Sequence, residues 1–341
     1  MFLTRSNVFH YLVERKFCDL EAGVSGPFAV RSRPRRNLNF HVTCGSREYL
    51  VKQAKVWDSE SRATVESEAA FYRRREGYPY LASLIPRCYS FDPPNSILVF
   101  EFLSGYTDLY DLADRFSPEV GRLCGENMAA YHREMEMDSL ALEFPEAGPS
   151  YLSLHEWTEN TEELSSAQRE FLRVLKRYPA FGQELDRLRA EWKPDALTHG
   201  DWKLDNCLLS EDGRHLRMVD WEFVAWGDSI GDVGALLQSY WNFWVRSPAE
   251  DPIESIRPAL RAFLEAYAKA RGREPVEFAA RAIRFAGARM LQTVFETLDK
   301  AEEMTGPALR LLQGSLNILT RPDWAAEQLI GTPLRKTNAS V

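Results

Sequence analysis

The strongest constraint on the fold is a change of periodicity near residue 103. Before it, short runs of β-branched and aromatic residues are separated by turn residues, a pattern typical of strands. The expected strands are residues 28–30, 40–43, 49–53, 86–91 and 97–102, the last almost wholly apolar and therefore expected in the centre of a sheet. After Tyr110, apolar residues recur mostly at helical spacing. The chain thus predicts a bilobal α+β fold with a small β-rich N-lobe, residues 1–103, and a larger, mainly helical C-lobe, residues 104–341.

Composition excludes several classes of protein. The formal net charge of −8 gives no bulk attraction to nucleic acid. The five cysteines include no CxxC pair, which argues against a zinc site and for reduced thiols. We see no secretory h-region and no run of about 20 apolar residues that would span a membrane. The expected location is the cytoplasm.

One segment carries recognisable chemistry: HGDWKLDN, followed downstream by VDWE. Phosphoryl transfer needs a group that orients the attacking hydroxyl, ligands for Mg²⁺, and positive charge near the transferring group. Asp201 can orient the hydroxyl, and Lys203 can supply positive charge. Asn206 and Asp220 offer the hard oxygen ligands that Mg²⁺ prefers. A tight loop can aim Asp201 and Asn206 into one cleft, and a hairpin over residues 207–219 would return the chain to Asp220.

These motifs resemble the aminoglycoside phosphotransferase and choline kinase-like family, whose fold is related to that of protein kinases. The family pattern HxDxxxxN is matched by His199, Asp201 and Asn206, and Asp220 matches the family's metal-binding aspartate. The resemblance implies ATP and Mg²⁺ as cofactors, Asp201 as catalytic base, and Asn206 with Asp220 as metal ligands. Lys203 stands two residues after Asp201, as in protein kinases, whereas many antibiotic kinases lack it.

The same resemblance assigns supporting roles to buried polar residues. His132, on an expected helix, and His199 are expected to brace the catalytic loop rather than to take part in the chemistry. Asp228 and Asp232, in GDSIGD, resemble the family's GDPxxD segment and are expected to form a turn and an N-cap beneath that loop.

A nucleotide site is expected in the N-lobe. Lys52 lies within an apolar strand, where a lysine is costly unless it is paired or faces a ligand; the resemblance makes it the lysine that holds the α- and β-phosphates. Its partner should be a glutamate on the next helix, residues 61–75. At 100° per residue, Glu68 borders the inward apolar stripe of that helix while Glu66 lies on its outer flank, so Glu68 is the predicted partner.

Two further elements of this site follow from the resemblance. The loop of residues 33–39 lacks GxGxxG, and Asn37 stands where the family often has an asparagine; whether such a loop closes over the nucleotide stays open. Adenine is expected to bond the backbone of Glu101 and Leu103 in the lobe connector. The sequence does not decide between ATP and GTP, and it leaves the oligomeric state open.

The acceptor is not identified by sequence. Three classes stay open: a kinase of a small molecule or natural product, a peptide or protein Ser/Thr kinase, and a catalytically silent scaffold that binds a partner protein. The acidic segment 143–166 carries Glu156, Glu159, Glu162 and Glu163 among its carboxylates and predicts a cationic acceptor; the alternative is a solvated acidic loop. The aromatic run 240–244 either lines an acceptor pocket or packs in the core.

Overall fold

The computed structural model describes residues 1–33, 37–55, 59–112, 116–141, 143–158, 162–246 and 253–331. The chain folds into two compact units: unit 1 comprises Met1–Thr107 and Leu208–Val224, and unit 2 comprises Asp108–Cys207 and Ala225–Val341. Among the helices in the described ranges, none combines the length and the apolar character needed to cross a membrane.

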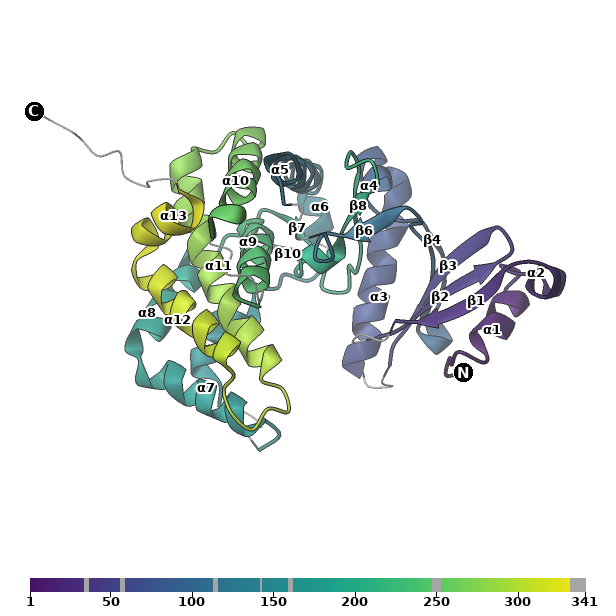
Figure 1. The fold of residues 1–341 in the computed structure, drawn as a ribbon, viewed down its shortest axis with the longest axis horizontal. Helices are drawn as coiled ribbons and strands as arrows, with labels where there is room; N and C mark the ends of the chain where they lie inside the picture. The colour runs from purple at the N-terminus through teal and green to yellow at the C-terminus, as the bar shows by residue number, and fades with distance from the viewer. Residues whose placement is uncertain are drawn as a thin grey trace, which may run out of the picture. The chain divides into compact units, whose positions relative to one another are not determined.

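Unit 1 is built on an antiparallel sheet with the strand order β1-β2-β3-β5-β4 (Figure 1). Its strands are β1 (Phe28–Ser32), β2 (Leu38–Cys44), β3 (Arg47–Gln53), β4 (Cys88–Asp92) and β5 (Ile97–Glu101). The turn between β2 and β3 passes through Gly45 at φ 63°, a conformation that glycine adopts without steric cost. All five expected strands are present, but the apolar run at residues 97–101 is not the central one. It forms an internal strand, β5, and β3 lies in the middle of the sheet.

A helical layer completes the core of unit 1. The helices are α1 (Val8–Glu14), α2 (Leu20–Ser25), α3 (Ser59–Arg73) and α4 (Pro79–Leu84), with 3-10 turns at Arg74–Gly77 and Pro93–Asn95. Val8 and Leu12 of α1 share one buried cluster with Val42, Val51 and Val99 of the sheet. Helix α1 therefore covers part of one sheet face with its apolar stripe, as Figure 1 shows.

A hairpin from late in the chain also belongs to unit 1. Strands β8 (Cys207–Ser210) and β9 (Leu216–Met218) form the predicted hairpin, and β6 (Tyr106–Asp108) pairs beside β8. Nη1 of Arg217 donates to the carbonyl oxygens of Ala82 and Ile85, at 3.1 and 3.3 Å. These bonds tie the hairpin to the end of α4, which explains why Leu208–Val224 groups with unit 1. The sequence-based division at residue 103 had placed this hairpin in the C-lobe.

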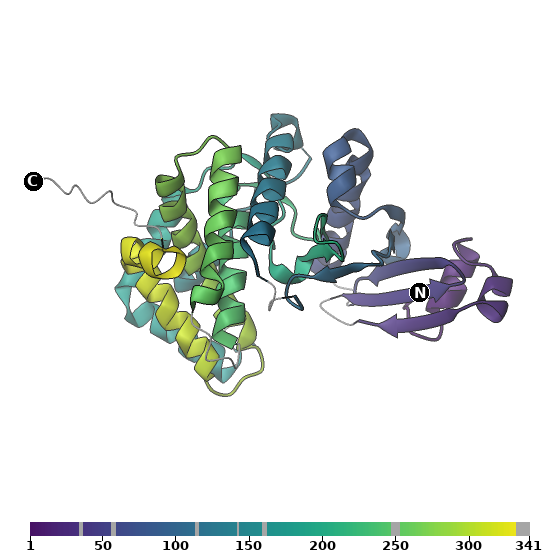
Figure 2. The ribbon, with the colours of Figure 1, turned by 45° about the horizontal axis from the view of Figure 1, so that its top comes forward.

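Unit 2 is mainly helical. Its helices are α5 (Pro118–Glu134), α6 (Asp138–Ala141), α7 (Ser166–Arg177), α8 (Pro179–Glu191), α9 (Ile230–Arg246), α10 (Arg257–Ala270), α11 (Pro275–Thr297), α12 (Gly306–Thr320) and α13 (Pro322–Ile330). Short 3-10 helices are η4 (Ser150–Glu156), η5 (Leu204–Asn206) and η6 (Ile253–Ser255). Strands β7 (Ala196–Thr198) and β10 (Ala225–Gly227) form an antiparallel pair. Helix α5 packs along α10, and α9 packs along α11 (Figures 1 and 2).

The α5–α10 contact depends on two glycines. A Cβ atom at Gly121 would collide with the carbonyl oxygen of Ala259, and one at Gly125 would collide with that of Phe263. The two glycines are four residues apart and therefore lie on one face of α5. Small residues at this spacing let the helix backbones approach closely.

Within the acidic segment 143–166, residues 143–158 contain more regular structure than the loop expected from the sequence. It contains η4, in which Tyr151, Leu152 and Leu154 are buried. The backbone of Glu146 forms a bridge to Trp226 beside β10. This segment thus contributes side chains to the core of unit 2. Glu159 lies outside the described residues, as do residues 34–36 of the expected phosphate-covering loop.

Candidate active site

Lys52 on β3 is the centre of a buried charge cluster in unit 1. Its residue is 4% exposed, and its Nζ lies 2.7 Å from Oε2 of Glu68 on α3 and 3.2 Å from Oε2 of Glu222. The same Nζ donates to Oδ1 of Asp220. One ammonium is therefore surrounded by three carboxylates. The predicted pairing of Lys52 with Glu68, rather than with Glu66, is present.

The electrostatics of this cluster reflect its surplus of negative charge. Burial lowers the pKa of Lys52, but the three carboxylates outweigh burial and raise that pKa above its ordinary value, so the side chain stays charged. Burial raises the pKa of Glu68, and the attraction of Lys52 offsets only part of that rise. A further cation would relieve the surplus, because the carboxylate oxygens of Glu68, Asp220 and Glu222 lie within 4.8 Å of one another.

Neighbouring groups orient the carboxylates. Nδ2 of Asn37 donates to Oε2 of Glu222 at 2.5 Å, and the backbone nitrogen of Trp221 donates to Oε1 of Glu68 at 3.2 Å. Asp220 has φ 70°, a left-handed conformation that aspartate tolerates better than most residues. This left-handed residue comes two positions after the end of β9.

The catalytic loop predicted from sequence lies in unit 2, between β7 and η5. Both carboxylate oxygens of Asp201 are engaged: Oδ2 lies 2.6 Å from Nζ of Lys203, and Oδ1 lies 2.9 Å from Nη2 of Arg289 on α11. Nδ2 of Asn206 donates to the carbonyl oxygen of Asp201 at 3.0 Å. These contacts hold the Asp201 carboxylate in one orientation. Nδ2 of Asn206 also donates to Oδ2 at 3.4 Å, so Oδ1 is the carboxylate oxygen whose second lone pair can accept a hydrogen bond from a hydroxyl.

The buried Asp232 supports the predicted catalytic loop through hydrogen bonds to its backbone. Asp232, at the start of α9, accepts from the backbone nitrogens of His199 and Gly200 at 2.8 and 3.0 Å. Nε2 of His132 lies 3.0 Å from the same carboxylate. Gly200 has φ 79°, a backbone conformation that glycine supplies most easily. The expectation that His132 and Asp232 brace the loop is confirmed.

Asn206 fits the role of a ligand to a hard cation. Its Oδ1 is buried and has no hydrogen-bond partner among the described residues, whereas its Nδ2 is used within the loop. An amide oxygen left in this way is the kind of ligand that Mg²⁺ takes. Asp220 belongs to unit 1 and Asn206 to unit 2, so their joint action as metal ligands stays a prediction.

Two other predicted nucleotide contacts lie at the end of β5. The backbone nitrogen of Glu101 donates to the carbonyl oxygen of Arg87 at 2.8 Å, and the carbonyl oxygen of Leu103 accepts from Tyr106 at 3.3 Å. Their part in adenine binding stays a prediction, as does the contact of Asn37 with nucleotide. Asn37 is 3% exposed, and its side-chain amide donates a hydrogen bond to Glu222, a carboxylate of the charge cluster.

The aromatic run 240–244 packs mainly in the core. Tyr240 and Trp241 are buried in α9. The ring of Phe116 stands edge-on to those of Tyr240 and Phe243, with centroids 4.5 and 5.6 Å apart. This packing favours the core interpretation over an acceptor pocket.

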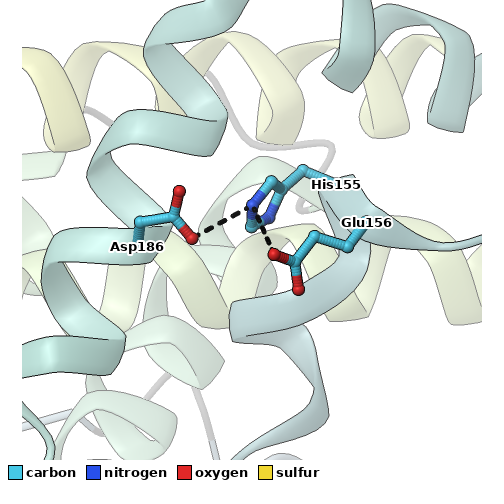
Figure 3. A group of neighbouring side chains, drawn as sticks. All are labelled: His155, Glu156 and Asp186. Carbon is cyan, nitrogen blue, oxygen red and sulfur yellow. Dashed lines mark ion pairs between the residues drawn. The ribbon is translucent and has the colours of Figure 1, made fainter.

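Glu156 of the acidic segment belongs to an ion-pair network. Nε2 of His155 lies 3.8 Å from Glu156 and 3.3 Å from Asp186 of α8, as Figure 3 shows. Arg189 binds Glu156 with both terminal nitrogens, at 2.6 and 2.9 Å, and also contacts Asp186. The positive charge of Arg189 compensates the carboxylates at this point, which weakens the case for attraction of a cationic acceptor.

Two residues of the candidate site, Glu222 and Arg289, were not predicted from the sequence. The sequence does contain a signal for Glu222, because it stands two residues after Asp220 in the VDWE motif. Arg289 had none, because it lies 88 residues from Asp201 in the chain on a helix without a motif.

Comparisons with known proteins identify the family of this chain. A family model described as APH, phosphotransferase enzyme family, matches residues 30–282. No curated protein sequence matches the chain.

Similar folds occur among solved structures. An ethanolamine kinase from Plasmodium vivax is 14% identical with a TM-score of 0.60, and the match covers 94% of this chain and 91% of that one. A choline/ethanolamine kinase family protein from Mesorhizobium loti is 15% identical with a TM-score of 0.61, covering 96% and 98%. An amicoumacin kinase, solved in complex with AMP-PNP, Ca²⁺ and Ami, is 13% identical with a TM-score of 0.58, and the match covers 98% of each chain. The predicted kinase-like, bilobal α+β fold is confirmed.

Proposed function

Because this chain belongs to the phosphotransferase enzyme family, we propose that it transfers the γ-phosphoryl group of ATP to a hydroxyl group of a small molecule. The observation that carries the proposal is the catalytic loop of unit 2. There, Asp201 is held by Lys203 and Arg289, and the side-chain oxygen of Asn206 is left without a protein partner among the described residues.

The reaction assigns one task to each residue. The acceptor oxygen forms a bond to the γ-phosphorus, the bond from that phosphorus to the bridging oxygen of ADP breaks, and the hydroxyl proton passes to the carboxylate of Asp201. Asp201 orients the hydroxyl by accepting its hydrogen bond. Lys203 compensates negative charge on the transferring group. Since positioning and electrostatics supply most of the catalysis of phosphoryl transfer, a fixed Asp201 carboxylate is what the chemistry needs.

The charge cluster of unit 1 is assigned to nucleotide and metal. Lys52, oriented by Glu68, would bind the α- and β-phosphates of ATP. Asp220 and Asn206 would hold Mg²⁺, and Glu222 is a further carboxylate able to do so. Bound Mg²⁺ neutralises phosphate charge. The surplus of carboxylates around Lys52 and the unused amide oxygen of Asn206 both fit a divalent cation.

A small-molecule acceptor is favoured over a peptide by the neighbours in fold, whose names refer to ethanolamine, choline and amicoumacin kinases. The proposal places the reaction in the cytoplasm, where ATP is made available. The cysteines, all of them free thiols, fit such a reducing compartment.

The test is Asp201→Asn, with Asp205→Asn in the same loop as its matched control. Transfer of labelled γ-phosphate to a panel of hydroxyl compounds should fall by about 10²–10⁴ in Asp201→Asn. MgATP affinity, measured by calorimetry, should stay near that of the wild type in both variants. If Asp201→Asn turns over at the rate of Asp205→Asn, Asp201 is not the catalytic base. If the wild type binds no MgATP, the proposed function is wrong.

A further inference from the structure

Arg289 is a buried cation whose bonding capacity is only partly used. It lies on α11 and is 7% exposed. Its Nη2 donates to Oδ1 of Asp201 at 2.9 Å. Among the described residues, its other terminal nitrogen, Nη1, has no hydrogen-bond acceptor. A charged donor that is buried without an acceptor costs free energy. Such a donor is therefore expected to form a hydrogen bond with a ligand.

The nearest carboxylate to Nη1 does not satisfy it. Oε1 of Glu296 lies 3.8 Å from Nη1, beyond hydrogen-bond distance, and the Glu296 side chain is 55% exposed. Water therefore screens most of the attraction between the two groups. The Arg289 side chain, by contrast, is 9% exposed.

A second buried donor belongs to the same region. Tyr151 of η4 is 3% exposed, and its hydroxyl has no partner among the residues that the structure describes. Helix α11 packs on η4. Burial raises the pKa of Tyr151; the positive charge of Arg289 opposes that rise, and the carboxylates of Asp232 and Asp228 add to it. A hydroxyl and a guanidinium nitrogen are thus both buried and both able to donate.

The charges around Asp201 also favour an anion. Lys203 and Arg289 together carry two positive charges and contact the single negative charge of Asp201. Glu296 is the other carboxylate near Arg289, but its side chain is 55% exposed and screened by water, so the charge of Arg289 is only partly compensated at Nη1. Arginine is suited to such a position because its planar group can bond two anionic partners at once.

We propose, on the basis of the function proposed above, that the acceptor is a hydroxy acid: a small molecule with a carboxylate or phosphate ester close to the hydroxyl that is phosphorylated. Nη1 of Arg289 binds the anionic group, and the hydroxyl of Tyr151 donates a second hydrogen bond to it. Because Nη1 and Nη2 belong to one guanidinium, the anionic group lies beside the carboxylate of Asp201. Arg289 therefore links acceptor recognition to the catalytic base. The same anion chemistry is also offered by the γ-phosphoryl group of ATP, and the test separates the two sources.

The experiment compares small hydroxy acids, such as glycerate and glycerol 3-phosphate, with neutral analogues, namely glyceramide and glycerol. Binding is measured by calorimetry with and without MgADP, in the wild type and in Arg289→Lys. Lysine retains one cationic donor for Asp201 but cannot bond two partners through a planar group. Arg284→Gln on the same helix, where Arg284 pairs with Glu191 at 2.9 Å, is the matched control. Thermal melting of each variant reports its folding.

The expected result is that at least one acid binds the wild type tenfold or more tightly than its neutral analogue. Arg289→Lys should lose tenfold or more of that affinity, and Tyr151→Phe should lose a smaller part. Arg284→Gln should bind like the wild type. MgATP affinity should stay near that of the wild type in Arg289→Lys.

Three results overturn the proposal. The first is equal binding of acids and neutral analogues, or no binding of either. The second is unchanged acid affinity in a folded Arg289→Lys protein. The third is a loss of MgATP affinity in Arg289→Lys that matches its loss of acid affinity, which assigns Arg289 to the γ-phosphoryl group instead. Failure of the wild type to bind MgADP would count against the phosphotransferase function, while the titrations without nucleotide would still decide whether Arg289 binds the acid.

Discussion

Replacing Lys52 by methionine should destabilise unit 1, apart from any effect on nucleotide binding. The variant removes the ammonium that lies between Glu68 and Glu222, whose side chains are only 2% and 4% exposed. Methionine fills a similar volume, so the main loss is electrostatic. Removing one partner of a buried ion pair costs about 3–5 kcal/mol. The Asp220 side chain, 29% exposed, adds little because water screens it.

We therefore expect a loss of about 4 kcal/mol, which corresponds to a fall in Tm of about 10 °C for a unit of this size. The assay is differential scanning calorimetry, with Lys55→Met as the control, because Lys55 is exposed in the same unit. The double variant Lys52→Met with Glu222→Gln should recover part of the loss, since only one buried carboxylate then remains beside Asp220. A Tm within about 2 °C of the wild type for Lys52→Met would refute the reasoning, because the carboxylates would then not need the ammonium.

Three further predictions follow from other parts of the structure. Asp220→Ala should weaken MgATP binding and reduce its dependence on Mg²⁺ in calorimetry; an identical metal dependence would exclude Asp220 as a ligand. Asp232→Asn should lower transfer activity and cost about 1–3 kcal/mol of stability in urea unfolding, because the charged acceptor of two loop amides is lost; wild-type activity would show that the loop does not depend on that charge. Gly121→Ala should lower Tm because its Cβ meets the backbone of α10, with a net cost of about 1–3 kcal/mol. Gly77→Ala, where a Cβ meets nothing within 4 Å, should be neutral, and equal behaviour of the two would contradict this account of the α5–α10 contact.

Most secondary structure and the local motifs could be predicted because they depend on neighbours in the chain. The turn at Gly45 and the hairpin of β8 and β9 follow from turn residues between apolar runs. Glu68 could be preferred to Glu66 because helical phase alone decides which side chain faces inward. The contacts of Asn206 with Asp201 depend on a spacing of five residues within one loop.

Contacts between distant segments could not be predicted in this way. The bond from Asn37 to Glu222 spans 185 residues, and nothing near either residue indicates the other. The grouping of the β8–β9 hairpin with unit 1 depends on Arg217, which donates to carbonyl oxygens at the end of α4. The carboxylates of segment 143–166 suggested a free acidic surface, whereas Arg189 of α8 pairs with Glu156.

The sequence by itself therefore determined the two-part organisation of this protein, the catalytic loop and the lysine–glutamate pair, since each depends on periodicity or on spacing along the backbone. Only the tertiary structure decided that Lys52 contacts three carboxylates and that Arg289 contacts Asp201. The physical reason is that packing, and not spacing along the chain, determines which remote side chains share a buried volume. Within such a volume, the low dielectric makes the choice of partner energetically decisive.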